Sequence, residues 1–553
     1  MHYLHPLFFQ SYIVGVPADL RILDESQRLD YMDLHRSAYM VEPELSVAFL
    51  NTLLSDTKQD FDDRKINAVT YYLNLAYQAR PLSVEIIQLY QMITPTPELA
   101  SYLDVLVKMP LDRKFIHPVQ SKNGTNEIHN RRKELLDILH RNPAHINAAL
   151  KLLDVDKVVG VDPSEWLTKF ICPRRLLTPW QMSLFFHYAK RGWSKKGLEL
   201  WDSIPSSMRR PYALTLAGDM FMLEGDQLSA VRQYTKALSM DPKLTPVRMR
   251  LDEISSPQIP RPELSRQRSV AICIFSWNNA QMLKVTLGSL AESDLGNATI
   301  HVLLNGCSDD SRSIVENSRR LFPNNTFEII DLPVNVGVAP ARNWLLQLPT
   351  VHKSDYVVFA DDDIMVPADW LSRYLTCIED DPQIGVVGPK AVSPPVASGE
   401  APRFQYLYRF VSVGQEGVFK LSLSEPGSES TDTGLYTFVR QVQHVMGCLI
   451  LLRNSILREV GAFDIRYNPS QVEDLDHDLA TCLAGYKVVY CGTVQVIHYR
   501  KSSDSIFVKK PALWSSLANH LKMSVKFEEH ADKLLQQARE LTNGYSSTPR
   551  RLV

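Results

Sequence analysis

Three consecutive carboxylates, Asp361, Asp362 and Asp363, directly follow a short apolar run over residues 356–360. The run predicts a buried strand, and carboxylates crowded at a strand end repel one another unless a cation lies among them. Because side chains alternate along an extended chain, Asp361 and Asp363 point one way and Asp362 points elsewhere. The pattern predicts a hard divalent ion between Asp361 and Asp363, which would hold a diphosphate. The alternative is a solvated acidic turn that caps the helix beginning near Pro367.

Strands and helices alternate ahead of these aspartates. The sequence predicts strands at 269–276, 300–304, 327–332 and 356–360, with helices between them. This order implies a mainly parallel sheet, whose ligands lie at the carboxyl ends of the strands. We therefore expect Ser276, Trp277, Asn278 and Asn305 beside the aspartates. Neither a G-x-G-x-x-G after the first strand nor a P-loop sequence occurs, so another device must hold phosphate.

The first 254 residues have helical periodicity, and residues 255–268 are rich in proline and polar residues, as in a linker. The helical pattern is clearest over 178–245. Residues 214–242 resemble a tetratricopeptide repeat through Gly218, Phe221, Ala230, Tyr234, Ala237 and Pro242. A weaker copy precedes it. Stacked helix pairs commonly form a groove for a peptide or protein; the alternative is that they only pack on the neighbouring domain.

Size and charge narrow the classes of protein. The chain has 553 residues, enough for two or three domains, and a net charge of −2, which argues against a nucleic-acid-binding protein. Its seven cysteines have no paired spacing, and we expect reduced thiols in the cytoplasm. No apolar run approaches the roughly 20 residues of a transmembrane segment. If the protein acts at a membrane, we therefore expect that it is recruited there. Nothing indicates the oligomeric state.

Seven segments follow one another between residues 268 and 505: VAICIFSWNN, LLNGCSDDS, NVGVAPARN, FADDD, HVMGCLILLR with REVGAFD, VEDLDHDLATCLAGYKVVY and VQVIHYRKSS. Their order resembles glycosyltransferase family 2, which has the GT-A fold. This resemblance implies an α/β GT-A domain over 269–505. With the residue patterns on either side, the sequence predicts a multidomain chain: tetratricopeptide-like all-α repeats over 1–254, the linker 255–268, the GT-A domain, and a C-terminal helical extension over 506–553.

The resemblance also implies a donor site. Asp363 would be the direct ligand of Mn²⁺ or Mg²⁺, His498 would complete the metal site, and Asp361 would serve either ribose or metal. Asp362 would lie within the donor-binding group. A divalent ion there acts as Lewis acid and template for the departing phosphate. An ordinary core histidine is the alternative for His498.

Other residues are implied in nucleotide recognition. Arg342 would contact the nucleotide; the alternative is that it forms a surface ion pair. Arg500 and Lys501 would bind the diphosphate; the alternative is that they belong to a solvated basic turn. The family's uracil-binding aspartate falls on Leu304 here, so a preference for UDP-sugars is less secure. Asn305 or Asn278 would then hydrogen-bond the base and Trp277 would stack on it, unless Trp277 is a buried core residue. Ser276 borders the same site.

The acceptor hydroxyl must lose a proton as it attacks, and Asp474 matches the family's general base. Its neighbour Glu473 points in a different direction on the same helix start and would cap or orient. The alternative is that both carboxylates only stabilise a helix N-terminus. A single base without a second nucleophile implies one displacement with inversion at the anomeric carbon.

The leading hypothesis is thus a cytoplasmic, metal-dependent, inverting glycosyltransferase. It would move a sugar from a nucleotide-diphosphate sugar, with a UDP-sugar as the first choice, to an acceptor hydroxyl. The helical repeats would present a protein or peptide acceptor. The alternatives are a transferase for a cell-surface polysaccharide or lipid-linked glycan, an inactive transferase-like scaffold, and a sugar nucleotidyltransferase, which usually needs a basic glycine-rich loop absent here. Residues 400–436 are rich in aromatics and then polar, as in a mobile loop over the site or a disordered insertion.

Overall fold

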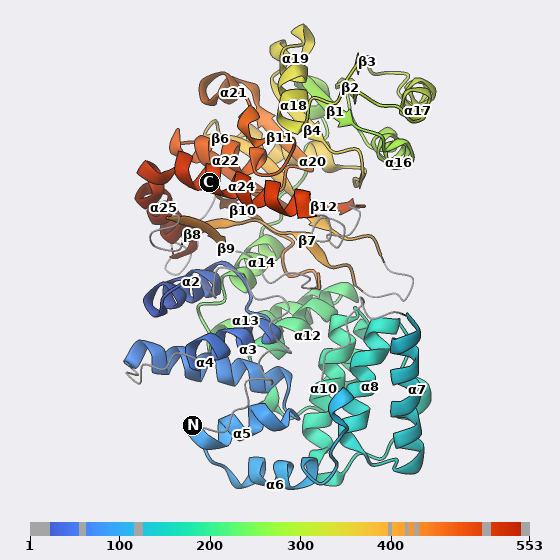
Figure 1. The fold of residues 1–553 in the computed structure, drawn as a ribbon, viewed down its shortest axis with the longest axis vertical. Helices are drawn as coiled ribbons and strands as arrows, with labels where there is room; N and C mark the ends of the chain where they lie inside the picture. The colour runs from blue at the N-terminus through green and yellow to red at the C-terminus, as the bar shows by residue number, and fades with distance from the viewer. Residues whose placement is uncertain are drawn as a thin grey trace.

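The chain folds into a helical region, an α/β sheet domain and two C-terminal helices, which confirms the predicted fold class. The computed structural model describes residues 23–54, 62–115, 125–395, 401–414, 420–424, 431–499 and 510–543. Figure 1 shows the helical region in the lower half of the molecule and the sheet domain in the upper half. Among these described residues, no helix has the length and apolar character needed to cross a bilayer.

The helical region consists of consecutive helices, many of them packed as sequential pairs such as α3 with α4 and α12 with α13. Its helices are α2 (Glu25–Ala38), α3 (Pro43–Leu54), α4 (Asp63–Ala79), α5 (Val84–Ile93), α6 (Pro97–Leu106), α7 (Thr125–Arg141), α8 (Ile146–Val159), α9 (Ser164–Leu167), α10 (Leu177–Lys190), α11 (Ser194–Trp201), α12 (Pro211–Leu223), α13 (Gln227–Met240), α14 (Thr245–Ser255) and α15 (Leu264–Gln267).

Small residues allow two of these helices to approach their partners closely. A Cβ atom at Gly218 in α12 would lie 2.5 Å from Cε1 of Tyr234 in α13. A Cβ atom at Gly197 in α11 would lie 2.4 Å from the sulfur of Met220. Both distances are far inside van der Waals contact. The rigid ring of Tyr234 requires a glycine at 218, whereas the end of the Met220 side chain can move away from a Cβ atom at 197. The tetratricopeptide assignment itself stays a prediction.

The sheet domain is built around one large mixed sheet. Its main strand order is β10-β12-β6-β11-β4-β1-β2-β3, with β5 pairing β12 and β7 pairing β6. Strand β1 pairs in parallel with β2 and β4, β2 pairs in parallel with β3, and β11 runs antiparallel between β4 and β6. The strands are β1 (Val270–Ser276), β2 (Thr299–Asn305), β3 (Phe327–Leu332), β4 (Tyr356–Ala360), β5 (Ile364–Met365), β6 (Ile384–Val392), β7 (Phe404–Tyr406), β8 (Phe410–Val413), β9 (Leu421–Ser424), β10 (Val439–Val442), β11 (Leu449–Arg453) and β12 (Lys487–His498).

Helices cover both faces of this sheet. Strand β1 alternates between the two layers: Val270 and Ile272 pack with helix α16 on one face, and Ala271 and Cys273 pack with helix α18 on the other. The helices of the sheet domain are α16 (Ala280–Ala291), α17 (Ser311–Ser318), α18 (Val338–Leu346), α19 (Pro349–Lys353), α20 (Trp370–Glu379), α21 (Asn454–Val460) and α22 (Glu473–Leu483). The buried faces hold the strand ends in fixed positions.

Strands β8 and β9 form a separate two-stranded sheet that joins the domains. The hydroxyl of Tyr39, just after α2, donates to the backbone oxygens of Tyr408 (3.0 Å) and Ser424 (2.9 Å), and its ring stacks on Tyr408. Strand β8 also contacts the C-terminal helix α25 (Ala531–Asn543). The described strands of the 400–436 region therefore form an interdomain contact, while residues 425–430 of the expected polar loop lie outside the described residues.

Candidate active site

Two carboxylates and an imidazole meet where β4 ends. The Nε2 atom of His498 lies 3.0 Å from Oδ1 of Asp363 and 3.9 Å from Oδ2 of Asp361. Strand pairing produces this meeting, because β5 pairs with the end of β12 and places Ile364 opposite His498. One ligand atom from each of the three residues lies within 4.8 Å of the others, which is the spacing of a candidate cation site. His498 is buried but is not packed as an ordinary core histidine, since its ring nitrogen faces the carboxylates.

Asp362 points away from this group. Its carboxylate accepts a hydrogen bond from the hydroxyl of Ser276 and another from the side-chain amide of Asn279 (2.9 Å). Burial raises the pKa of Asp362 to about 6, although both hydrogen bonds lower it. Asp362 thus ties the end of β4 to the end of β1, and Ser276 is committed to the same contact.

Arg342, on α18, lies at the centre of the site. One guanidinium nitrogen is 4.0 Å from Asp361 and donates to the backbone oxygen of Gly447 (3.1 Å); the other is 3.6 Å from Glu473. With 2% of its surface exposed, Arg342 is not part of a surface ion pair. Burial raises the pKa of Asp361 to about 7, with Asp363 adding to the rise and Arg342 opposing it.

Glu473 and Asp474 begin helix α22, and Glu473 approaches the guanidinium nitrogen of Arg342 that does not face Asp361. The carboxylate of Asp474 accepts hydrogen bonds from the backbone N–H of Gly447 (3.0 Å) and of Leu475 (2.8 Å). Burial raises the pKa of Asp474, but the charges of His444 and Arg342 and the two backbone hydrogen bonds outweigh burial, so this pKa is lowered overall. Burial, reinforced by Asp474, raises the pKa of Glu473 to about 7. The pKa values of these two adjacent carboxylates are therefore shifted in opposite directions.

Gly447 lies in contact with both Asp474 and Arg342. A Cβ atom at this position would lie 2.7 Å from Oδ2 of Asp474 and 3.0 Å from Nη2 of Arg342. A larger residue would therefore push the two side chains apart. We call Arg342, Asp361, Asp363, Glu473, Asp474 and His498 the charged centre.

Asn278 and Asn305, at the ends of β1 and β2, form hydrogen bonds with neighbouring loops. The Oδ1 atom of Asn278 accepts from the backbone N–H of Ser308 (2.7 Å). The side-chain amide of Asn305 donates to Asn335 (3.0 Å), and its oxygen accepts from the N–H of Val336 (2.9 Å). The amide of Asn305 is thus already used within the protein.

Trp277 is 56% exposed, so the interpretation of a buried core tryptophan was wrong. Leu304, in place of the expected aspartate, is fully buried in the apolar layer beneath the sheet. Arg500 and Lys501 lie outside the described residues.

Two features near Asp474 were missed by the sequence analysis. His444 is 2.8 Å from Asp478, which accepts from the N–H of Val445 and so fixes the segment leading to Gly447. Asn519, on the C-terminal helix α24 (Lys510–Lys526), donates to the backbone oxygens of Tyr467 (2.9 Å), Ser470 (3.0 Å) and Gln471 (3.1 Å). No local sequence signal distinguishes these residues, because their partners are far along the chain.

Residues 271–460 match the family described as Glycosyl transferase family 2. This segment is a family 2 glycosyltransferase domain. The matched segment contains Arg342, Asp361 and Asp363, whereas Glu473, Asp474 and His498 follow it.

Two curated proteins named as glycosyltransferases match half of the chain. The pre-mycofactocin glycosyltransferases of two Mycobacterium tuberculosis strains, CDC 1551 / Oshkosh and ATCC 25618 / H37Rv, are each 27% identical over 279 residues. These matches cover 50% of this chain and 51% of each relative, so the chain spans about half the length of the curated relatives it matches.

Solved structures similar to the chain are remote in sequence. The mannosyltransferase PcManGT from Pyrobaculum calidifontis, in complex with GDP-Man and Mn²⁺, is 17% identical with a TM-score of 0.36, covering 57% of this chain and 83% of its own. GalNAc-T7 with UDP, GalNAc and Mn²⁺ is 13% identical with a TM-score of 0.37, covering 50% and 55%. TarS 1-349 of S. aureus with UDP-GlcNAc is 15% identical with a TM-score of 0.34, covering 49% and 72%.

Proposed function

We propose that the chain transfers a sugar from a nucleotide-diphosphate sugar to an acceptor hydroxyl, with inversion at the anomeric carbon. The observation that carries the proposal is the charged centre. There, residues more than a hundred positions apart bring two carboxylates with an imidazole, and a second pair of carboxylates, next to the guanidinium of Arg342. A transferase needs these two functions side by side, one for the leaving diphosphate and one for the acceptor proton.

Asp361, Asp363 and His498 would hold the divalent cation, Mn²⁺ or Mg²⁺. Two of the three donor groups fit such an ion, because carboxylate oxygens suit both metals, and the imidazole nitrogen of His498 would supply a third ligand. A bound cation supplies Lewis-acid stabilisation of the leaving diphosphate. Arg342 adds a fixed positive charge beside Asp361, and the exposed ring of Trp277 is available to stack on the base.

Asp474 would be the general base. Its lowered pKa keeps it ionised at neutral pH, as a base requires, and hydrogen bonds from Gly447 and Leu475 fix its orientation. Glu473, with its pKa near 7, faces Arg342 and would orient the arginine rather than accept the proton. In the step, the acceptor oxygen bonds to the anomeric carbon, the bond to the diphosphate oxygen breaks, and the acceptor proton passes to Asp474.

For the acceptor we propose a protein or peptide held by the helical region. The related glycosyltransferases are named for pre-mycofactocin, and a polysaccharide or lipid-linked glycan is the rival acceptor class. For the donor we propose a UDP-sugar, with a GDP-sugar as the alternative that the buried Leu304 leaves open.

Incubation of the protein with a panel of nucleotide sugars and Mn²⁺ tests the proposal. We expect release of the nucleoside diphosphate from one donor, abolished by a chelator, and a product of inverted anomeric configuration by NMR. Release without chelator sensitivity would contradict the metal assignment, and a retained configuration would contradict the single displacement. No turnover and no metal-dependent nucleotide binding would favour an inactive scaffold.

A further inference from the structure

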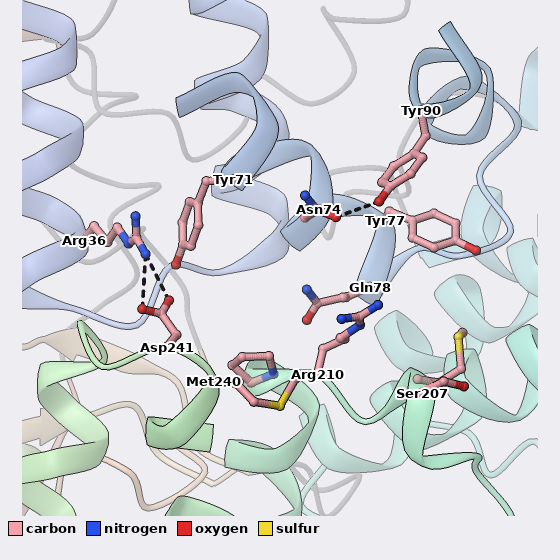
Figure 2. Close-up of a pocket in the computed structure, with 12 residues that line it drawn as sticks. Arg36, Tyr71, Asn74, Tyr77, Gln78, Tyr90, Ser207, Arg210, Met240 and Asp241 are labelled. Atoms are coloured by element: carbon pink, nitrogen blue, oxygen red, sulfur yellow. Dashed lines mark hydrogen bonds and ion pairs between the residues drawn. The ribbon is translucent and has the colours of Figure 1, made fainter. Parts of the chain in front are cut away.

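The helical region contains a hollow of about 390 Å³ that is separate from the charged centre. Its walls come from four distant parts of the chain: the end of α2, one face of α4 with α5, the start of α12, and the end of α13. Figure 2 shows the side chains of Gln78 and Arg210 next to each other in the middle of this hollow. A volume of this size is in the range of pockets that bind small ligands or peptide side chains.

The hollow carries one positive charge that no carboxylate neutralises. Arg36 and Asp241 form an ion pair at its edge, with a nitrogen–oxygen distance of 3.1 Å. The exposed guanidinium of Arg210, in contrast, makes no hydrogen bond or ion pair with any residue that the structure describes. A guanidinium in a concave site is suited to bind a carboxylate.

Gln78 adds an uncommitted amide beside this charge. Its side-chain oxygen is buried and has no hydrogen-bond partner among the described residues. A buried amide oxygen without a partner costs free energy, so a ligand N–H at this position would be stabilising. An amide that both donates and accepts matches a peptide backbone, which offers the same two groups.

A smaller recess of about 60 Å³ adjoins the hollow and shares part of its lining, including Asn74, Gln78 and the ion-paired Asp241. Met40, Val41, Leu75 and Leu244 line this recess. It is therefore apolar and suits one aliphatic side chain of a ligand.

The aromatic rings here do not offer a platform for a sugar. The guanidinium of Arg36 covers one face of Tyr71, 3.6 Å from the ring centroid. Tyr77 and Tyr90 pack on each other with centroids 5.0 Å apart, and the hydroxyl of Tyr90 is bonded to Asn74. With one face of Tyr71 covered and Asp241 held in its ion pair, the hollow is less suited to a saccharide than to a peptide.

We propose that this hollow binds a peptide segment that carries a carboxylate side chain and, close to it, an aliphatic side chain. The carboxylate pairs with Arg210, the backbone bonds to Gln78, and the aliphatic side chain enters the recess. That the segment belongs to the acceptor rests on the proposed function; the binding itself does not.

Selection of a random heptapeptide library on the immobilised full chain tests the binding. We expect enrichment of peptides with Asp or Glu near Leu, Ile, Val or Met. For a synthetic peptide of the enriched sequence, fluorescence anisotropy should give a Kd at least about tenfold higher for Arg210→Glu than for the wild type. Arg174→Glu, which makes the same charge change at an exposed arginine outside the hollow, should leave the Kd unchanged.

Arg210 precedes α12 without a side-chain capping bond, so its replacement should leave the fold intact. Gln78→Leu is a second variant, which should also weaken binding. The proposal is overturned if no peptide is enriched, if the enriched peptides lack acidic residues, or if Arg210→Glu binds with wild-type affinity. Retention on a glycan array that depends on Arg210 would also overturn it. Because binding is measured without nucleotide or metal, its failure is distinct from failure of the transferase proposal.

Discussion

At the scale of single residues, Arg342 connects the two sides of the charged centre. Its guanidinium faces Asp361 on one side and Glu473 on the other, and a third contact reaches the backbone oxygen of Gly447. The planar guanidinium of arginine has several donors in fixed directions, so it suits such a bridging position better than the flexible ammonium of lysine. The spacing between donor side and acceptor side therefore depends on one buried side chain.

The Gly447 position gives a sharp test of this spacing. Gly447→Ala places a methyl group 2.7 Å from a carboxylate oxygen of Asp474, so we expect Asp474 and Arg342 to shift and kcat to fall at least about tenfold. The matched control is Gly288→Ala in α16, where a Cβ atom meets nothing within 4 Å and the helix should gain stability by about 0.5–1 kcal/mol. Steady-state kinetics of both variants provide the check, and an unchanged kcat for Gly447→Ala would argue against Asp474 as the base.

At the scale of elements, the C-terminal helix α24 supports the loop that leads to Asp474. Gln471 and Val472 have positive φ values of 82° and 80°, which non-glycine residues rarely adopt. Asn519 bonds three carbonyl oxygens of this loop, and Lys526 bonds Asp476 of helix α22 (2.7 Å). Helix α24 therefore contributes to the geometry at the start of α22.

Removal of these hydrogen bonds should affect turnover more than donor binding. For Asn519→Ala we expect a loss of stability of about 2–4 kcal/mol, a lower kcat, and a donor KM close to the wild-type value. Asn297→Ala is the matched control, because Asn297 is exposed and donates to one backbone oxygen, that of Arg266. Kinetics combined with thermal unfolding distinguish the roles: a reduced Tm with wild-type kcat would mean that Asn519 only stabilises the fold.

At the scale of the whole molecule, the helical region and the sheet domain share a buried contact around Asp219. This carboxylate, on α12, accepts hydrogen bonds from Tyr234 on α13 (2.7 Å) and from Thr433, which follows β9 in the sheet domain. Burial raises the pKa of Asp219 to about 7, although the two hydrogen bonds lower it. The contact between the two regions therefore includes a group that titrates near neutral pH.

The sign of the resulting pH dependence follows from proton linkage. Because the folded-state pKa lies above the ordinary value of 3.8, the contribution of Asp219 to stability is present below about pH 4 and is lost as the pH rises through about 7. Asp219→Asn removes this titration, so we expect the stability of the wild type relative to the variant to fall by a few kcal/mol, as an order of magnitude, between pH 4 and pH 8. Chemical denaturation at several pH values measures this difference; a difference independent of pH would show that Asp219 stays ionised in the folded protein.

Local sequence predicted most of the fold. The predicted strand 356–360 matches β4, and the predicted strand 327–332 matches β3. A short apolar run with polar residues at both ends is typical of a buried strand. The pairing of β5 with β12 was not predictable, although it brings His498 to Asp363; a two-residue strand has no periodicity to read. The role of Asn519 and the packing of β8 against α2 were hidden for a similar reason, since both depend on contacts between distant segments.

The central claim is that metal binding and proton transfer are divided between Asp363 and Asp474. Calorimetric titration of Mn²⁺ with UDP and with GDP, paired with turnover, tests it in Asp363→Ala and Asp474→Asn. We expect Asp363→Ala to lose metal-dependent nucleotide binding and turnover together. Asp474→Asn should bind like the wild type and lose about 10²–10⁴-fold in kcat. Metal-dependent binding retained by Asp363→Ala, or wild-type turnover retained by Asp474→Asn, would contradict the account.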